Sequence, residues 1–338
     1  MSPSISIIVC AHNSEKTIEK CLQSLIAQKD IDTEIIVVDD GSTDATVKKC
    51  QKYRCDSKIK LLSIPRGGPS LARNCGMDVA TGDFIGFVDS DDYVENTMYS
   101  ELYTAAKEAK ADIVICEFVR ESPDGKRIYT GDCKLPAEFP DLLENQQICT
   151  MYLPQILVGN NSLHIPIFGG VWRCLYRRNY LLSIGAKFNQ HLKFGEDLHF
   201  NFSVLSKASC MKICRKQLYH YVQWPNSLGS AIQEDTSENY LRLFRELKSL
   251  IARGNLEKCQ IPYVIWVNRF STYLVVEVLR KLGGACSKKT VLTIQKDQTV
   301  RECASRYSTG TLSLKKWIVL QLIRMRMIVL LYYMRGLL

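Results

Sequence analysis

The sequence lacks any apolar run of the ~18 residues that a membrane-spanning helix needs, which excludes a multi-pass membrane protein. It also lacks a basic segment ahead of its first apolar stretch, Ile5–Ala11, so we expect no secretory signal peptide. With 46% hydrophobic and 23% charged residues, the composition is that of a globular protein rather than a disordered one. The length of 338 residues predicts two domains, or one large domain with additions.

Cys-x-x-Cys pairs are absent as well, although the chain has 14 cysteines. The cysteines are scattered singly, and several of them, such as Cys10 and Cys116, lie within apolar runs. This spacing disfavours zinc sites and a disulfide framework. It favours buried free thiols in a reducing cytoplasm.

Acidic residues are missing from the last part of the chain, where none follows Glu302. The basic residues beyond that point are Arg306, Lys315, Lys316, Arg324, Arg326 and Arg335. Of the net charge of +9, these six leave only +3 (9 − 6) for the rest of the chain. A nearly balanced body argues against a nucleic-acid-binding protein.

Short β-branched apolar runs alternate with helical patterns over the first 120 residues or so. The expected strands are Ser4–Cys10, Glu34–Val38, Ile59–Ser63, Phe84–Val88 and Asp112–Phe118. This alternation predicts an α/β fold in which a doubly wound, mostly parallel sheet is flanked by helices. Residues 121–170 are expected to form a loop-rich insert with short helices, Gln217–Val222 another strand, and the chain from Ser237 onward a helical extension.

Polar clusters begin where three of these strands end. His12-Asn13 follows the first strand, Asp39-Asp40 the second and Asp89-Ser90-Asp91 the fourth. Because the carboxyl ends of parallel strands share one edge of a sheet, we expect a ligand site there. Asp89 and Asp91 are oxygen ligands suited to Mg²⁺ or Mn²⁺ bridging the phosphates of a nucleotide, with a capped turn as the structural alternative.

Glycine is missing from the loop after the first strand, Cys10–Ser14. A dinucleotide-dependent dehydrogenase needs a Gly-x-Gly-x-x-Gly segment at this position. A sugar-nucleotide nucleotidyltransferase needs a glycine-rich phosphate loop with basic residues in the same place. The composition of this loop therefore disfavours both enzyme classes.

The order and spacing of four segments resemble those of a known family. The segments are Ile7-Ile8-Val9 with Asn13, Val37–Asp44, Ala72–Gly76 and Phe87–Asp92. Together, over roughly the first 120 residues, they resemble the family 2 glycosyltransferases of GT-A fold. The resemblance implies a nucleotide-sugar donor, with UDP as the expected nucleotide. It also implies Mn²⁺ or Mg²⁺ at the Asp-x-Asp motif and transfer with inversion.

The resemblance also assigns roles to individual residues. It implies that Asp91 holds the metal and that Asp89 contacts the ribose or the metal. It also implies that Asp39 contacts the nucleobase and that Arg73 lies in the nucleotide region. The residues expected to line the nucleotide-sugar site are Ala11, Asn13, Glu15, Asp39, Asp40, Ser42, Arg73, Asn74, Asp89 and Ser90.

The second half resembles the family more loosely, through Trp172–Arg178 and Phe194–Phe200. Inverting transfer needs a base that takes the proton of the acceptor hydroxyl. The resemblance favours Asp197 as this base and Glu196 as the residue that orients the acceptor, whereas the structural alternative is a pair of helix caps. His220 lies between two tyrosines and is a further candidate metal ligand, although such a histidine is more often simply packed.

The chain is therefore expected to comprise a GT-A domain, residues 1–225, and a helical C-terminal region, residues 226–338. Residues 1–118 would bind the nucleotide sugar and residues 119–225 the acceptor. In the basic tail an apolar stripe is formed by Ile318, Leu322, Met325, Val329 and Tyr332. This pattern predicts an amphipathic helix on an anionic membrane surface, with packing on the body or on a second copy in a homo-oligomer as the alternative.

The sequence thus predicts an inverting, metal-dependent glycosyltransferase that is cytoplasmic and peripheral at the inner leaflet of the membrane. Its donor would be a nucleotide-diphosphate sugar, with a UDP-sugar favoured, and its acceptor a hydroxyl of a glycan or lipid-linked glycan. The non-enzymatic alternative is a catalytically inactive scaffold of a glycan-assembly complex. Intact Asp89, Asp91 and Asp197 count against a scaffold.

Overall fold

The computed structural model describes residues 3–53, 56–128, 133–158, 169–193, 195–224 and 237–253, together with isolated residues between 292 and 333. The chain divides into two compact units, residues 1–156 with 165–224 and residues 157–164 with 225–338. The division after residue 224 adjoins the boundary expected from the sequence, which follows residue 225. All of the site described below belongs to the first unit.

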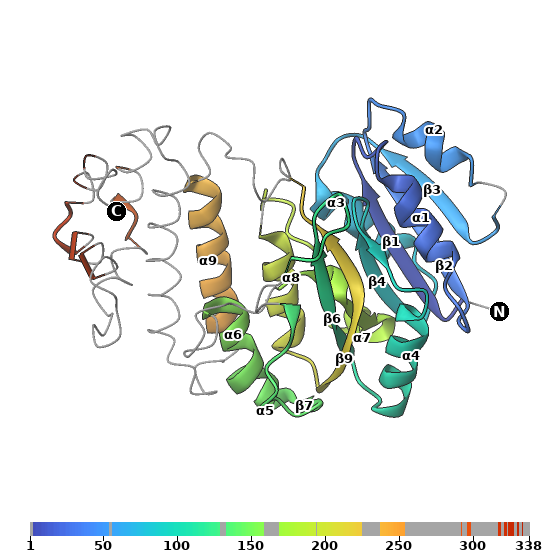
Figure 1. Ribbon diagram of the computed structural model, residues 1–338. Coiled ribbons are helices and arrows are strands. Elements are labelled where there is room, and N and C mark those ends of the chain that lie inside the picture. Colours follow the sequence, from blue (N-terminus) through green and yellow to red (C-terminus); the bar gives the residue numbers. More distant parts are fainter. Residues whose placement is uncertain are drawn as a thin grey trace. The chain divides into compact units, whose positions relative to one another are not determined.

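Among the described residues, nine strands of the first unit form one mixed sheet in the order β3-β2-β1-β4-β8-β6-β9-β5, and β7 pairs with β9 (Figure 1). The strands are β1 (Ile5–Ala11), β2 (Thr33–Asp40), β3 (Ile59–Ile64), β4 (Phe84–Asp89), β5 (Tyr93–Val94), β6 (Ile113–Glu121), β7 (Leu142–Glu144), β8 (Cys174–Arg177) and β9 (Cys210–Val222).

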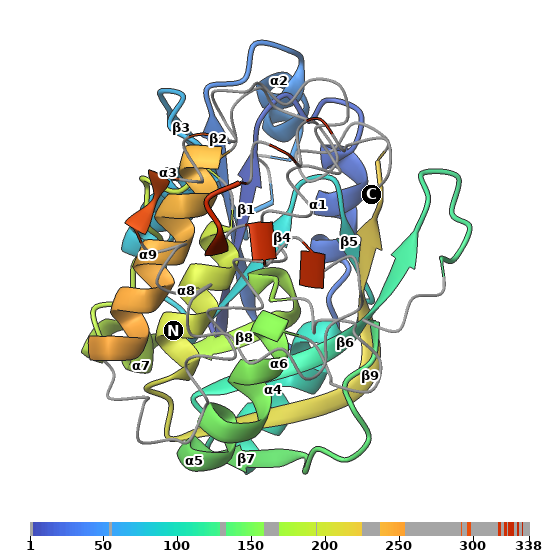
Figure 2. The same cartoon turned by 90° about the vertical axis from the view of Figure 1, so that its left-hand side faces the viewer.

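The first four strands run parallel to one another, as the alternating sequence pattern predicted. β8 is antiparallel to both β4 and β6 and separates these two strands. β9 is parallel to β6 and extends well ahead of the strand Gln217–Val222 expected from the sequence. β5, which the sequence did not predict, pairs with β9 just after the polar segment that follows β4 (Figure 2).

The helices between residues 18 and 205 connect these strands and flank the sheet on both faces (Figure 1). They are α1 (Ile18–Ile26), α2 (Thr46–Gln51), α3 (Pro69–Val79), α4 (Met98–Glu108), α5 (Asn145–Gln147), the π-helix η2 (Ile148–Tyr152), α6 (Leu153–Val158), the 3-10 helix η3 (Val171–Arg173), α7 (Arg178–Ser183) and α8 (Glu196–Leu205). The short helices between β6 and β8 agree with the expected insert. Residues 159–168 of that insert lie outside the described residues.

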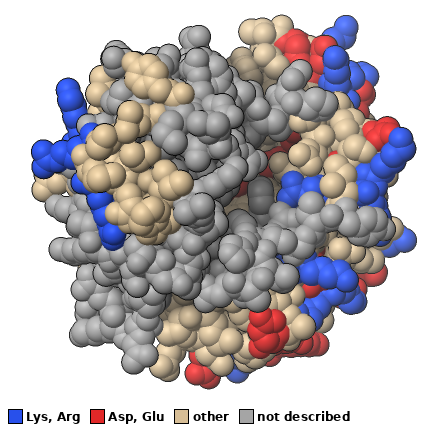
Figure 3. Space-filling model, turned by 60° about the vertical axis from the view of Figure 1, so that its left-hand side comes forward, with Lys and Arg blue, Asp and Glu red and all other residues tan. Residues whose placement is uncertain are grey.

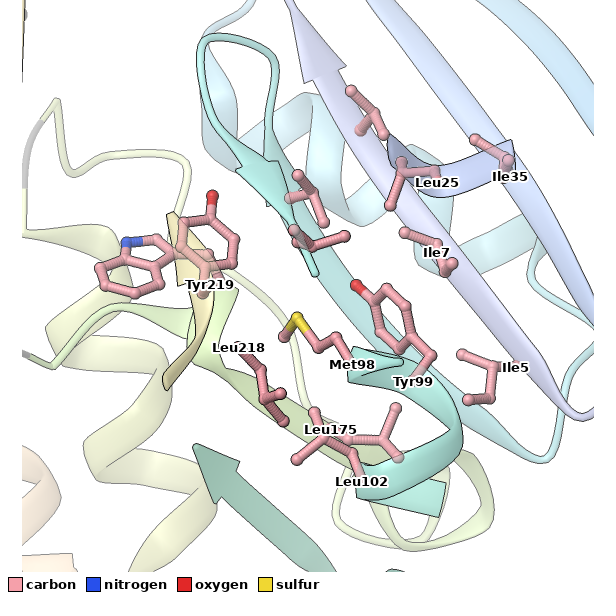
Figure 4. Close-up of a cluster of buried hydrophobic side chains, with 14 of the residues drawn as sticks. Ile5, Ile7, Leu25, Ile35, Met98, Tyr99, Leu102, Leu175, Leu218 and Tyr219 are labelled. Carbon is pink, nitrogen blue, oxygen red and sulfur yellow. The ribbon is translucent and has the colours of Figure 1, made fainter. Parts of the chain in front are cut away.

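Alternate residues of β1 pack against helices on opposite faces of the sheet. Ile5, Ile7 and other odd-numbered positions join a buried cluster with residues of α1 and α4 (Figure 4). Ile8 faces α3, where a Cβ on Gly76 would come within 2.5 Å of the Ile8 side chain. The absence of a side chain at Gly76 therefore lets α3 lie close to the sheet, which positions the residues that α3 contributes to the site.

Ten cysteines are described, and all ten are free thiols, as the scattered spacing predicted. On the right-hand side of the face shown in Figure 3, the described Lys and Arg side chains lie among Asp and Glu side chains. Within the described part of the chain, no helix combines the length and the apolar character needed to cross a membrane.

In the second unit, α9 (Ser237–Arg253) is helical as predicted. The rest of the expected helical extension, including the amphipathic tail, lies outside the described residues except for isolated positions.

Candidate active site

The polar segments that follow β1, β2 and β4 meet at one edge of the sheet, as the sequence predicted. The strand register pairs Ala11 with Asp39 and Cys10 with Asp89, so the three strands end side by side. This is the edge at which parallel α/β sheets bind ligands. Ala11 is buried and apolar, so only its backbone could take part in the nucleotide binding expected of it.

The loops after β1 and β2 are tied together by hydrogen bonds between side chains and backbone. Asn13 adopts a φ of 49°, accepts from the Thr43 N–H at 2.9 Å and donates its own N–H to Ser42 Oγ at 3.0 Å. The Ala45 N–H donates to Glu15 Oε2 at 3.0 Å. Three residues expected to bind the nucleotide, Asn13, Glu15 and Ser42, thus also hold the two loops against each other.

The two aspartates that end β2 differ in their surroundings. Asp39 is buried and accepts a backbone hydrogen bond at 3.2 Å. Asp40 accepts from the N–H groups of Gly67 and Gly68 at 2.6 and 2.9 Å and pairs with Arg66. The Asp40 carboxylate therefore anchors the loop before α3, and its expected contact with the nucleotide stays a prediction.

Asn74 on α3 holds the chain segment that leads toward α8. Its Nδ2 donates to the Phe188 carbonyl at 2.9 Å, and its Oδ1 accepts from the Phe188 N–H at 2.8 Å. Ser70, one turn earlier on the same helix, donates to the Asn189 carbonyl at 3.2 Å. Because both ends of its amide are engaged, Asn74 has a positioning role here, and its expected contact with the nucleotide stays a prediction.

Arg73 on α3 joins two groups of carboxylates that are far apart in the sequence. Its Nη1 lies 2.9 Å from Glu196 Oε1 and 2.7 Å from Asp197 Oδ1, while its Nη2 lies 3.0 Å from Asp89 Oδ1. Burial alone would lower the pKa of Arg73, but Asp197, Asp89 and Glu196 outweigh this effect and raise that pKa well above its usual range. Arg73 is thus a permanent cation among three carboxylates.

Glu196 and Asp197 are the first two residues of α8, which begins after Gly195 in the left-handed conformation (φ 74°). The N-terminus of a helix favours negative charge, so both α8 and Arg73 stabilise this carboxylate pair. Burial raises the pKa of Asp197, Arg73 lowers it, and Glu196 and Asp89 raise it again, with a raised value as the result. Asp197 is therefore more basic than an ordinary aspartate, which suits a general base.

The three aspartates of the turn after β4 differ in their side-chain partners. Asp89 pairs with Arg73. Asp92 is buried and accepts from the Tyr219 hydroxyl and the Val222 N–H, each at 2.7 Å. Among the described residues, Asp91 has no side-chain partner, and burial together with Asp89 raises its pKa to about 6.

This division of roles fits a divalent cation at Asp91. Its partly buried carboxylate lies near that of Asp89, and Arg73 is already paired with Asp89, Glu196 and Asp197. No group of three metal-ligating side chains occurs among the residues that the structure describes. The protein would therefore supply one or two oxygen ligands, as is usual where a magnesium ion is also held by substrate phosphates and water.

His220 does not lie free beside these aspartates. Its Nδ1 is 3.2 Å from Glu121 Oε1, its Nε2 is 2.9 Å from Glu95 Oε1, and its ring stacks on Tyr93 at 4.2 Å. Both ring nitrogens are engaged by carboxylates, so metal coordination would require one of these bonds to break. The packed alternative describes His220 best, and we remove it from the proposed metal ligands.

Ser90, the remaining expected nucleotide ligand, is buried and its Oγ lies 2.7 Å from Ser14 Oγ. It therefore connects the turn after β4 to the loop after β1.

Two residues of the site, Asp92 and Tyr219, were assigned no role from the sequence. Asp92 could have been recognised as part of the run Asp89-Ser90-Asp91-Asp92. Tyr219 carried no such signal, because its hydrogen-bond partner lies 127 residues away in the chain.

Comparisons with known proteins place this arrangement in context. The family model described as Glycosyl transferase family 2 matches residues 6–179. The glycosyltransferase EpsJ of Bacillus subtilis (strain 168) is 35% identical over 244 residues, which cover 72% of this chain and 67% of EpsJ. The poly(ribitol-phosphate) beta-glucosyltransferase of Bacillus spizizenii is 26% identical over 261 residues, or 76% of this chain and 38% of that protein.

A solved structure extends the likeness to the fold. Residues 1–349 of S. aureus TarS, in complex with UDP-GlcNAc, match with a TM-score of 0.68 at 21% identity. The match covers 99% of this chain and 92% of the TarS chain. At this level of identity the likeness concerns the fold.

Proposed function

This chain belongs to glycosyltransferase family 2 and has the GT-A fold, and we propose that it transfers a sugar, with inversion, from a nucleotide-diphosphate sugar to a hydroxyl of a glycan or lipid-linked glycan. The observation that carries the proposal is the position of Arg73. Its guanidinium contacts Asp89, at the end of β4, and Glu196 with Asp197, at the start of α8. Groups suited to hold a diphosphate and groups suited to take a proton therefore lie within reach of one side chain.

Asp197 is the proposed base. It takes the proton of the acceptor hydroxyl while the hydroxyl oxygen forms its bond to the anomeric carbon and the bond from that carbon to the diphosphate breaks. Burial raises the pKa of Asp197 and thereby increases its proton affinity, while Arg73 opposes that shift and favours the ionised form that must accept the proton. Glu196, bonded to the same guanidinium, orients the acceptor.

The turn after β4 is the proposed diphosphate site. Asp91, with Asp89 beside it, would hold Mn²⁺ or Mg²⁺, which offsets the negative charge that grows on the diphosphate as it leaves. Asp39 lies across the β1–β2 edge and contacts the base or ribose. The loops joined through Asn13 and Ser42 form the wall beside it.

A UDP-sugar is the proposed donor and a polyhydroxylated polymer the proposed acceptor. The first inference is supported by TarS, whose structure contains UDP-GlcNAc. The second is supported by the name of the relative that glucosylates poly(ribitol-phosphate). Both statements describe those proteins, and the experiment below tests the first of them, the donor, for this chain.

The deciding experiment incubates the full chain with a panel of nucleotide sugars and Mn²⁺, without acceptor, and measures slow release of the nucleoside diphosphate. We expect hydrolysis of one UDP-sugar above the others and no hydrolysis by the Asp91→Asn variant. Hydrolysis of none, with no nucleotide binding by calorimetry, would contradict the glycosyltransferase proposal. A preference for a different nucleotide would correct only the identity of the base.

We also propose that the basic tail binds an anionic membrane surface. The argument rests on the sequence, in which six basic residues and no acidic residue follow Glu302 and an apolar stripe accompanies them. Each Lys or Arg near an anionic surface contributes about 1 kcal/mol, and the apolar stripe adds burial.

Vesicle sedimentation tests the membrane proposal. The full chain should sediment with anionic vesicles at low salt, and less with neutral vesicles or at high salt. A chain ending at residue 307 should remain in the supernatant and keep donor hydrolysis. Absence of vesicle binding by the full chain would remove the proposal.

A further inference from the structure

The turn after β4 is held from behind by a side chain of β9. The Tyr219 hydroxyl donates to Asp92 Oδ2 at 2.7 Å and accepts from the backbone N–H of Asp89 at 3.2 Å. Asp92 also accepts from the Val222 N–H at 2.7 Å. We call the Tyr219 hydroxyl and the Asp92 carboxylate the brace; its hydrogen bonds reach both ends of the four-residue turn that carries Asp91.

The turn needs such a brace because it concentrates negative charge. Within four residues it contains three aspartates, and Arg73 pairs with only the first of them. Repulsion between these carboxylates favours conformations that separate them. A buried carboxylate that accepts hydrogen bonds from a hydroxyl and a backbone N–H is instead fixed in place.

The position of the Tyr219 hydroxyl is set independently of the turn. The tyrosine ring is fully buried and stacks on Trp172 with the ring centroids 4.4 Å apart. Strand pairing fixes the same region, because Val94, two residues beyond Asp92, lies opposite Tyr219 in the β5–β9 register. A rigid hydroxyl is therefore presented to Asp92, the end of the turn that neither the Arg73–Asp89 pair nor the Ser90–Ser14 hydrogen bond reaches.

We propose that Tyr219 is a positioning residue for the donor, whose hydroxyl holds the turn in the geometry that lets Asp91 face the metal-bound diphosphate. The inference rests on the proposed function and goes beyond it, since Tyr219 touches neither the sugar nor the acceptor. Its effect passes through Asp92 and the backbone of Asp89. Loss of the hydroxyl should therefore weaken donor binding and leave the proton transfer at Asp197 nearly unchanged.

Tyr219→Phe tests the proposal, with Tyr99→Phe as a matched control. Both tyrosines belong to the same buried cluster (Figure 4). The Tyr99 hydroxyl is buried and has no hydrogen-bond partner among the described residues, so its removal breaks none of the hydrogen bonds described. Each variant thus loses one buried hydroxyl, and only Tyr219→Phe loses contact with the turn.

The first measurement is calorimetric titration of UDP at a series of Mn²⁺ concentrations. Removing a side chain that orients a metal ligand typically costs 10-fold to 100-fold in metal affinity. We expect Tyr219→Phe to need roughly tenfold more Mn²⁺ for half-maximal UDP binding, and Tyr99→Phe to need the same amount as the wild type.

The second measurement separates positioning from a general loss of structure. In donor-hydrolysis assays, KM for the donor should rise roughly tenfold for Tyr219→Phe while kcat stays within about twofold, because binding is lost equally in the ground and transition states. Asp92→Asn provides a second variant. Asp92 accepts hydrogen bonds from two donors, the Tyr219 hydroxyl and the Val222 N–H, and the NH₂ group of an asparagine cannot accept from either of them. This variant should show the same metal dependence as Tyr219→Phe.

Two results would overturn the proposal. One is an unchanged Mn²⁺ requirement in Tyr219→Phe, and the other is a fall in kcat with KM unchanged, which would assign the residue to the chemical step. Failure of the proposed function looks different, because wild-type protein would then bind no UDP in the presence of Mn²⁺.

Discussion

The turn after β4 and the first turn of α8 both present carboxylates to Arg73, but they are stabilised in different ways. In α8, local structure stabilises the carboxylates, because Glu196 and Asp197 begin a ten-residue helix whose N-terminus favours negative charge. In the turn, Asp92 relies on Tyr219 and Val222 of the distant strand β9. A carboxylate in a helix start is thus supported by its own segment, whereas one in a turn depends on the tertiary fold.

The same difference separates the proposed chemistry of the two regions. Asp197 is buried and paired with Arg73, a setting that tunes proton affinity. Asp91 has no side-chain partner in the described part of the chain, a setting that suits coordination of a cation. Substitutions confined to one region should therefore affect one partial reaction and spare the other.

The largest effect is expected from Asp197→Asn, which keeps the shape of the side chain and removes its ability to accept the proton. Transfer should fall by roughly 10²–10⁴, the range typical of a lost general base, while UDP-sugar affinity stays near that of the wild type. Initial rates and calorimetry measure the two quantities. Glu196→Gln is the matched control at the neighbouring position, and a larger loss of transfer in that variant would reverse the two assignments.

Asp91→Asn should produce the opposite pattern, with the loss in binding. The affinity for a UDP-sugar in the presence of Mn²⁺ should fall by about 10-fold to 100-fold, because an amide is a poorer ligand than a carboxylate for a hard cation. Affinity measured in chelator should barely change. If wild-type affinity were the same with and without chelator, the metal would have no part in donor binding.

The pH dependence should connect the two regions through Asp197. Burial, with Glu196 and Asp89 adding to it and Arg73 opposing it, raises the pKa of Asp197 from 3.8 to about 7. Only the ionised form accepts a proton, so transfer should fall about tenfold for each pH unit below that value.

Stability should change in the other direction over the same interval. Between pH 4 and 7 the folded protein holds a proton on Asp197 that the unfolded chain has released. The contribution of this group to the free energy of unfolding is therefore present at low pH and is lost as the pH rises toward 7. Melting curves of the wild type and Asp197→Asn, compared across this range, isolate the contribution, and parallel curves would contradict it.

The sequence predicts the residues of this site whose position depends on their own strand, turn or helix. It does not predict the contacts that depend on residues far away in the chain. The parallel strands, the polar edge, the Asp89–Asp91 pair and the Glu196–Asp197 pair all carry local patterns, and the structure contains them where expected. Roles that depend on distant partners were not predictable in the same way. His220 has a carboxylate on either side only because β5, β6 and β9 meet around it.

Asp40 and Asn74 show that a motif alone does not reveal which of its side chains are already engaged within the protein. Each is a polar residue in a family-like motif, and each has its side chain engaged by the backbone of another segment, Gly67-Gly68 and Phe188 respectively. A motif identifies the segment that builds a site. Which of its side chains remain free for a ligand is decided by hydrogen bonds that form only in the folded chain.

The smallest effect is expected from Asn74→Ala, which removes support for the α8 region and leaves the turn untouched. The variant leaves the N–H and carbonyl of Phe188 buried without their partner, which should lower the free energy of unfolding by about 1–3 kcal/mol. Ser70 lies on the same helix as Asn74, and Ser70→Ala loses a single 3.2 Å hydrogen bond to the Asn189 carbonyl, so this variant should cost less stability. Urea unfolding measures both. Because Asn74 supports the chain that leads to α8, transfer should fall a few-fold while Mn²⁺-dependent UDP binding remains unchanged. A loss of UDP affinity instead would support the nucleotide-binding role predicted for this residue.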